Sequence, residues 1–89
     1  PGVNDVLREV VAEISAAPHS AASLTLYALM STLEYEQAGY LFKLAKLRDL
    51  SAGQRQLAYR LMDLMAAGAN AGDEWRNAKC EMDALVRTA

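Results

Sequence analysis

The sequence predicts an all-α fold with a long central second helix, either as a small four-helix bundle or as two helical hairpins. In four segments the apolar residues recur at steps of three and four, which is the period of an amphipathic helix. Strand signals are missing, because no run of Val, Ile or Thr alternates with polar residues and no Asn-Gly turn occurs. A chain of 89 residues corresponds to a single domain, with helices expected at about 3–17, 23–48, 52–67 and 73–87.

The first predicted helix covers residues 3–17. Val10 and Ile14 belong to an apolar face with regular helical spacing, while charged residues such as Glu13 fall elsewhere on the helix. Pro18 has no backbone N–H to continue the helix, so the helix is expected to end just before it. The connection that follows is short, which favours an antiparallel second helix.

The second helix is predicted to be the longest, and the other helices are expected to pack around it. Twenty-five helical residues, from 23 to 47, would span about 37 Å at a rise of about 1.5 Å per residue. Its main apolar face consists of Leu26, Leu29, Met30, Leu33, Tyr40, Leu41, Leu44 and Leu47.

A second, less regular strip of small and aromatic residues is predicted on the opposite side of this helix. One core layer cannot cover both sides, because the two sets of residues lie nearly opposite each other at about 100° per residue. Either other segments of the same chain cover the second strip, or another protein chain does. The strip comprises Ala28, Ser31, Tyr35, Ala38 and Phe42.

The third helix has a clear start signal. Ser51 and Gln54 have the spacing of a capping box, in which each side chain bonds the backbone N–H of the other residue. Leu57 and Leu61 belong to its inward face, and Gly68 is placed to end it. A bent but continuous helix through residue 87 is the alternative.

The fourth helix is predicted from Trp75, Met82 and other apolar residues at helical spacing. Asp73 and Glu74 suit the positive N-terminal end of its dipole, and Arg87 suits the negative C-terminal end.

Composition excludes several classes of protein. The net charge of −2 provides no overall attraction to nucleic acid or to anionic lipid. The longest uncharged run, residues 14–33, contains Pro18 and His19 and keeps a helical period, so no membrane span is predicted. The single cysteine, Cys80, allows no intrachain disulfide, and no segment resembles a signal peptide. We therefore expect a cytoplasmic protein.

No catalytic or metal-binding constellation is predicted. The one histidine, His19, follows a proline in a loop and has no glutamate three residues before it. Cys80 lies on the flank of a helix with no histidine near it in sequence. The glycines are isolated and form no phosphate-binding loop. We expect no enzyme activity, cofactor or metal.

A basic corner between the second and third helices suggests an alternative function as a nucleic-acid-binding regulator. Asp49 lies inside this cluster and the helices do not match a helix-turn-helix motif, so nucleic acid is the less favoured partner. The basic residues are Lys43, Lys46, Arg48, Arg55 and Arg60.

The hypothesis that the sequence favours is a non-enzymatic helical protein–protein interaction module. It is expected to form a homodimer through the second strip, Ala28, Ser31, Tyr35, Ala38 and Phe42. A further alternative is a small accessory subunit that binds a different protein through the same surface.

Overall fold

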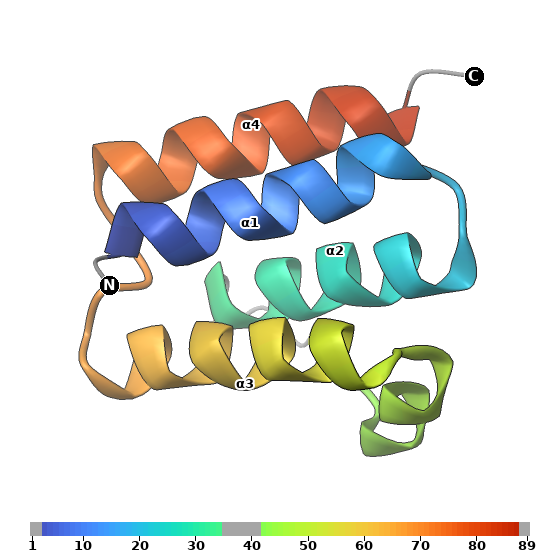
Figure 1. Ribbon diagram of the computed structural model, residues 1–89. Helices are drawn as coiled ribbons and strands as arrows, with labels where there is room; N and C mark the ends of the chain where they lie inside the picture. The colour runs from blue at the N-terminus through green and yellow to red at the C-terminus, as the bar shows by residue number, and fades with distance from the viewer. Residues whose placement is uncertain (1–2, 35–41, 88–89) are drawn as a thin grey trace.

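The computed structural model describes residues 3–34 and 42–87 of the chain (Figure 1). Within these ranges every regular element is helical and no strand occurs, so the predicted all-α class is confirmed. The elements are α1 (Val3–Ala16), α2 (Ala21–Glu34), the 3-10 helix η1 (Leu44–Asp49), α3 (Ala52–Ala66) and α4 (Asp73–Arg87).

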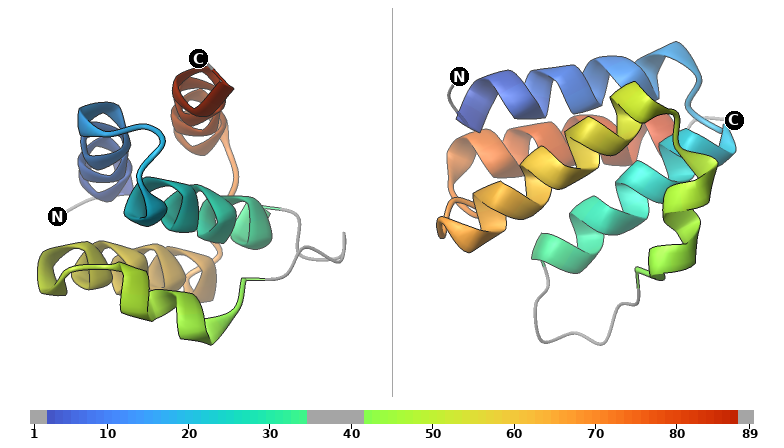
Figure 2. Two further views of the ribbon diagram at one scale, coloured as in Figure 1. Left: turned by 90° about the vertical axis from the view of Figure 1, so that its right-hand side faces the viewer. Right: turned by 60° about the horizontal axis from the view of Figure 1, so that its bottom comes forward.

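α1 and α2 form an antiparallel hairpin, whereas α3 and α4 make no extensive contact with each other and have α1 and α2 between them. In Figure 1, α1 runs antiparallel to α2, and α3 runs antiparallel to α4, while α2 and α3 point in the same direction. The most extensive contact joins α1 to α4, and α1 also packs on α2 and α3 (Figure 2). The structure is therefore a small helical bundle, the first of the two arrangements that the sequence predicts, but the parallel course of α2 and α3 means that its helices do not run up-down-up-down.

The prediction of one continuous helix over residues 23–48 is wrong. Lys43 has extended backbone angles (φ −84°, ψ 129°), and a 3-10 helix rather than an α-helix follows it. The spacing of Leu44, Leu47 and Leu50 explains the error, because steps of three suit a 3-10 helix as well as an α-helix. Tyr40 and Leu41, which were also assigned to the helix face, lie outside the described residues.

One apolar core joins all four long helices. Leu50, just after η1, is also part of it and is only 4% exposed. The other buried members are Val6, Leu7, Val10 and Ile14 of α1, Leu26, Leu29, Met30 and Leu33 of α2, Leu57, Ala58 and Leu61 of α3, and Trp75, Ala78 and Met82 of α4.

Local signals set the ends of α3. The Ser51 hydroxyl accepts from the Gln54 N–H at 3.2 Å, and the Gln54 side chain accepts from the Ser51 N–H at 2.8 Å, as the capping-box spacing predicts. At the other end Gly68 has a φ of 75°, which an α-helix cannot continue through. The alternative of one continuous helix from α3 into α4 is therefore wrong.

The loop after α3 also provides a hydrogen-bond donor to a backbone carbonyl at the end of α2. The Asn70 side chain donates a hydrogen bond to the Leu33 carbonyl at 2.7 Å, and this carbonyl lies in the last turn of α2. An open carbonyl at a buried helix end would otherwise cost free energy. The parallel course of α2 and α3 brings these two ends together.

We expect Leu61→Ala to lower the free energy of unfolding by about 2–5 kcal/mol, because the fully buried side chain leaves a cavity. Met65→Ala on the same helix is the control, since Met65 is 38% exposed and should cost much less. Urea unfolding followed through the fluorescence of Trp75, the one tryptophan, measures both. Equal losses for the two variants would contradict the described core.

Candidate protein-binding surface

A groove between α2 and η1 is the most apolar of three surface depressions, the others lying between α1 and α4 and between α1 and α3. Its volume is about 410 Å³. Two large hydrophobic side chains stand exposed at or beside it: Leu24 at 43% and Leu44 at 72%. The lining residues are Ala21, Leu24, Thr25, Ala28, Phe42, Lys43, Lys46 and Asp49.

The two walls of this groove differ in composition. The α2 wall carries small and apolar residues one turn apart, such as Leu24 and Ala28. The other wall begins with Phe42, which packs against the core, and continues along η1 with Lys46 and Asp49. Only one hydrogen bond described crosses it, from the Thr25 hydroxyl to the Asp49 carboxylate at 3.5 Å. The groove is therefore apolar at its base and charged along one edge.

Only some residues of the predicted second strip lie at the groove. Ala28 and Phe42 both line the groove, although Phe42 is not on α2 as expected. Ser31 is only 9% exposed, so its own chain already covers it and it is not available to a partner. Tyr35 and Ala38 lie outside the described residues.

The exposure of Leu24 was not predicted from the sequence. Leu24 is four residues before Ala28, which places it on the same side of α2 one turn earlier. That spacing was visible in the sequence. Leu44 was missed for a different reason, because it was assigned to the buried face of a helix that does not exist at that position.

The five basic residues proposed to bind nucleic acid do not lie together on one surface. Lys43 and Lys46 edge the α2–η1 groove, whereas Arg60 lines a different groove, between α1 and α3, and pairs with Glu9 at 2.8 Å. The Arg55 guanidinium donates to the Leu50 carbonyl at 3.1 Å. Arg48 is exposed on η1. Because two of the five have partners within the chain, the set does not form one continuous phosphate-binding surface.

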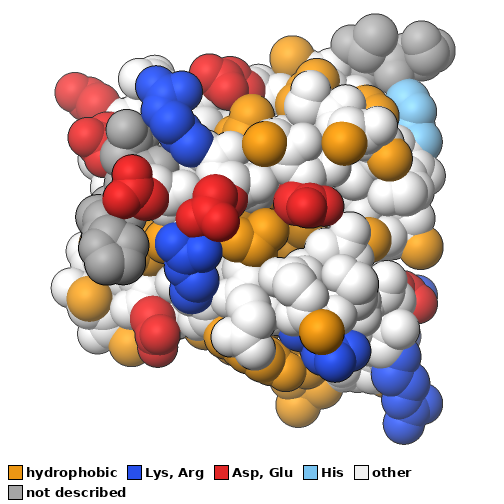
Figure 3. Space-filling model, viewed as in Figure 1, with side chains coloured by type: hydrophobic (Ala, Val, Ile, Leu, Met, Phe, Trp, Pro, Cys, Tyr) orange, Lys and Arg blue, Asp and Glu red, His pale blue; other side chains and the backbone are white. Residues whose placement is uncertain are grey.

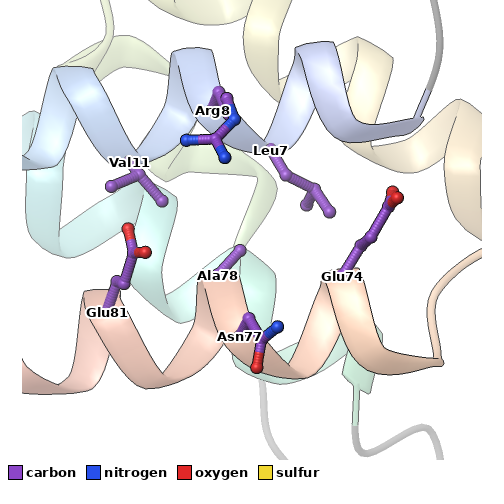
Figure 4. A pocket seen from close by; sticks show the side chains of 7 residues that line it. All are labelled: Leu7, Arg8, Val11, Glu74, Asn77, Ala78 and Glu81. Carbon is purple, nitrogen blue, oxygen red and sulfur yellow. The ribbon is translucent and has the colours of Figure 1, made fainter.

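A third depression, of about 310 Å³, lies between α1 and α4. Figure 4 shows Arg8 of α1 and Glu81 of α4 at this groove, above a base that includes Leu7 and Ala78. The face in Figure 3 carries acidic and basic side chains interspersed along the long helices, with further basic side chains over η1 at the lower right. Mixed charge of this kind suits a solvated surface.

A polar cluster joins α2 to α4 beside the core. The Tyr27 hydroxyl donates to the Asp83 carboxylate, and the Lys79 ammonium donates to the same oxygen at 3.1 Å. Lys79 is also 3.6 Å from the Glu34 carboxylate and lies 4.9 Å from the centre of the Tyr27 ring. Its side chain is only 8% exposed, so these contacts offset the cost of burying its charge.

The contacts shift the pKa values of this cluster. Burial raises the pKa of Tyr27, and its hydrogen bond to Asp83 raises it further. Burial lowers the pKa of Lys79, but the Asp83 hydrogen bond and the neighbouring negative charges outweigh this and raise it overall. Burial raises the pKa of Asp83, but hydrogen bonds from Tyr27 and Lys79 lower it more. The fold therefore favours the charged forms of Lys79 and Asp83 and the neutral form of Tyr27.

Residues that could bind a metal do not converge. No group of three or more His, Cys, Asp and Glu side chains comes together within residues 3–34 and 42–87. His19 lies with its Nε2 atom 2.9 Å from the Val86 carbonyl, and Cys80 is exposed on α4. Among the described helices, none is long and apolar enough to cross a membrane.

Comparison of the chain with protein-family models, with curated proteins and with solved structures gives no match. The chain belongs to the class of small α-helical bundles, and it carries an apolar surface groove.

We expect Asp83→Asn to lower the free energy of unfolding by about 1–2 kcal/mol at pH 7, because Lys79 and Tyr27 lose a charged acceptor. The folded pKa of Asp83 lies below its unfolded value of about 3.9, so its contribution is present above that pH and is lost as the pH falls through the folded pKa. Urea unfolding at pH 7 and over a series of pH values below the unfolded pKa of about 3.9 measures the difference.

The matched control for this prediction is Asp63→Asn, an exposed aspartate on α3, for which the change should stay within about 0.5 kcal/mol. A loss for Asp83→Asn that is as large at the lowest pH as at pH 7 would show that the charge of Asp83 is not what stabilises the cluster.

Proposed function

We propose that this chain is a non-enzymatic helical protein–protein interaction module that self-associates through the surface around the α2–η1 groove. The observation that carries the proposal is the exposure of Leu24 and Leu44 at or beside a groove that already contains Ala28 and Phe42. Isolated exposed apolar residues are common, but a contiguous apolar depression with exposed leucines is typical of an interaction site.

Apolar burial would drive the association. Removing apolar surface from water contributes about 25 cal/mol per Å², and complete burial of a leucine side chain contributes about 1.5–3 kcal/mol. A stable interface of standard size covers about 800 Å² on each partner. The chain exposes 5334 Å² in all, so such an interface would extend beyond the groove onto the neighbouring residues of α2 and η1.

Enzyme activity receives no support from the described residues. Among the described residues, the groove lining contains no histidine, cysteine or tyrosine, and its carboxylate, Asp49, accepts from the Thr25 hydroxyl. Catalytic sites combine a nucleophile or acid–base group with a second group that orients it. The groove instead combines an apolar base with a charged edge, which is the usual composition of a protein interface.

We expect the wild-type chain to sediment as a dimer at tens of micromolar and Ala28→Arg to sediment as a monomer, because a long charged side chain would fill the apolar groove. Ala66→Arg, an exposed alanine on α3, is the matched control and should remain dimeric. Circular dichroism should show equal helicity for all three proteins. A monomeric wild-type chain at these concentrations would refute self-association.

A further inference from the structure

We propose that the polar cluster between α2 and α4 fixes the rotation of α2 about its own axis. The cluster consists of Tyr27 and Glu34 on α2 and of Lys79 and Asp83 on α4. The rotation of α2 determines which of its side chains are buried and which face solvent. The proposal concerns a conformational device within the fold, and it holds whether or not the chain self-associates.

The apolar pattern of α2 does little to define which side of the helix faces the core. Of its 14 residues only Glu34 is charged. Leu24 is 43% exposed, whereas Leu29, about 140° further round the helix, is 2% exposed. On α1, by contrast, the exposed side carries charged residues such as Arg8 and Glu9. Apolar burial therefore orients α1 strongly but α2 only weakly.

The cluster holds one side of α2 against α4 at two levels. Tyr27 and Glu34 are seven residues apart, which is nearly two full turns, so they lie on the same side of α2. Lys79 and Asp83 are four residues apart and share one side of α4. At one level the Tyr27 hydroxyl donates to the Asp83 carboxylate, and at the other the Lys79 ammonium lies 3.6 Å from the Glu34 carboxylate. The hydrogen bond from Lys79 to Asp83, at 3.1 Å, joins the two levels.

A different rotation of α2 would be unfavourable because the Lys79 side chain is only 8% exposed. Turning α2 by one residue, about 100°, would move Tyr27 and Glu34 away from α4. The neighbouring positions 26, 28 and 33 are all apolar, so Lys79 and Asp83 would then face groups that cannot pair with them. A buried ion pair adds little stability compared with apolar residues of similar size, but burying a charge against unsuitable partners costs much more. The cluster therefore distinguishes one rotation from the others more than it adds stability.

Two other polar contacts of α2 constrain its rotation less. The hydrogen bond from the Thr25 hydroxyl to Asp49 is long, at 3.5 Å. The bond from Asn70 is accepted by the Leu33 carbonyl, a backbone group that points along the helix axis and not to one side of it. These contacts position the ends of α2, whereas the cluster with α4 selects the side that is buried.

The experiment compares thiol reactivity on two sides of α2 in a Cys80→Ser background. Ser23→Cys places a thiol where the wild-type side chain is 3% exposed, and Ala28→Cys places one at an exposed position about 140° away. With the cluster intact, we expect the thiol at position 28 to react at least about 100-fold faster than the one at position 23, because reaction at a buried site needs local opening.

The decisive variant makes the whole cluster apolar through Tyr27→Phe, Glu34→Met, Lys79→Met and Asp83→Leu. We expect it to keep its helicity and a urea midpoint close to that of the wild type, because no member of the cluster is left without a partner. Its α2 should adopt several rotations, so the reactivity ratio between positions 28 and 23 should fall below about 10-fold. A second variant, Tyr27→Phe with Glu34→Gln, changes only α2 and should lower the ratio in the same direction.

The matched control is Glu9→Gln with Arg60→Met, which removes an ion pair of 2.8 Å between α1 and α3. It should leave the reactivity ratio unchanged, because α2 takes no part in that pair. A wild-type ratio in both cluster variants would overturn the proposal. A lower ratio that appears only together with a large fall in the urea midpoint would also overturn it, since the cluster would then act through stability alone.

Discussion

The shared direction of α2 and α3 is the constraint on which the rest of the structure depends. Two parallel helices cannot be joined by a tight turn, so the chain must return from the end of α2 to the start of α3 along a path as long as a helix. With 14 residues at about 1.5 Å each, α2 requires a return of about 21 Å. The last part of that return is η1, which lies alongside α2 and is anchored in the core by Leu50. The α2–η1 groove exists because η1, with only about two turns, covers α2 less completely than a full-length helix would.

Burial of α2 is correspondingly uneven. Its core side is fully covered, and even Ser23, Thr25 and Ser31 are buried. Its α4 side is held by Tyr27 through the polar cluster with Lys79 and Asp83, where a buried ammonium is compensated by carboxylates and an aromatic face. The side beneath η1 is covered only in part, which leaves Leu24 and Ala28 at the surface. The apolar groove at this place follows from the path of the chain.

Charge is distributed in the same uneven way. The face formed by α1, α4 and α3 carries both signs and includes the ion pair of Arg60 with Glu9. The η1 edge carries Lys43 and Lys46 beside the apolar groove, with Asp49 at its end. A surface with mixed charge favours solubility, whereas an apolar depression with a short charged edge favours a specific contact. The two kinds of surface therefore lie on separate parts of this small domain.

The sequence by itself determined the all-α class, the helices α1, α3 and α4, and the residues that begin or end them. These features depend on local chemistry: the capping box of Ser51 and Gln54, the positive φ of Gly68, and the missing N–H of Pro18. Only the tertiary structure decided that residues 44–49 form a 3-10 helix, because leucines spaced by three fit an α-helix and a 3-10 helix alike. Leu50, just after η1, is buried in the core among residues far away in the chain, and local spacing does not predict such a contact. The groove has the same origin, since its two walls meet only after the core has formed, and no spacing within either wall reveals the other.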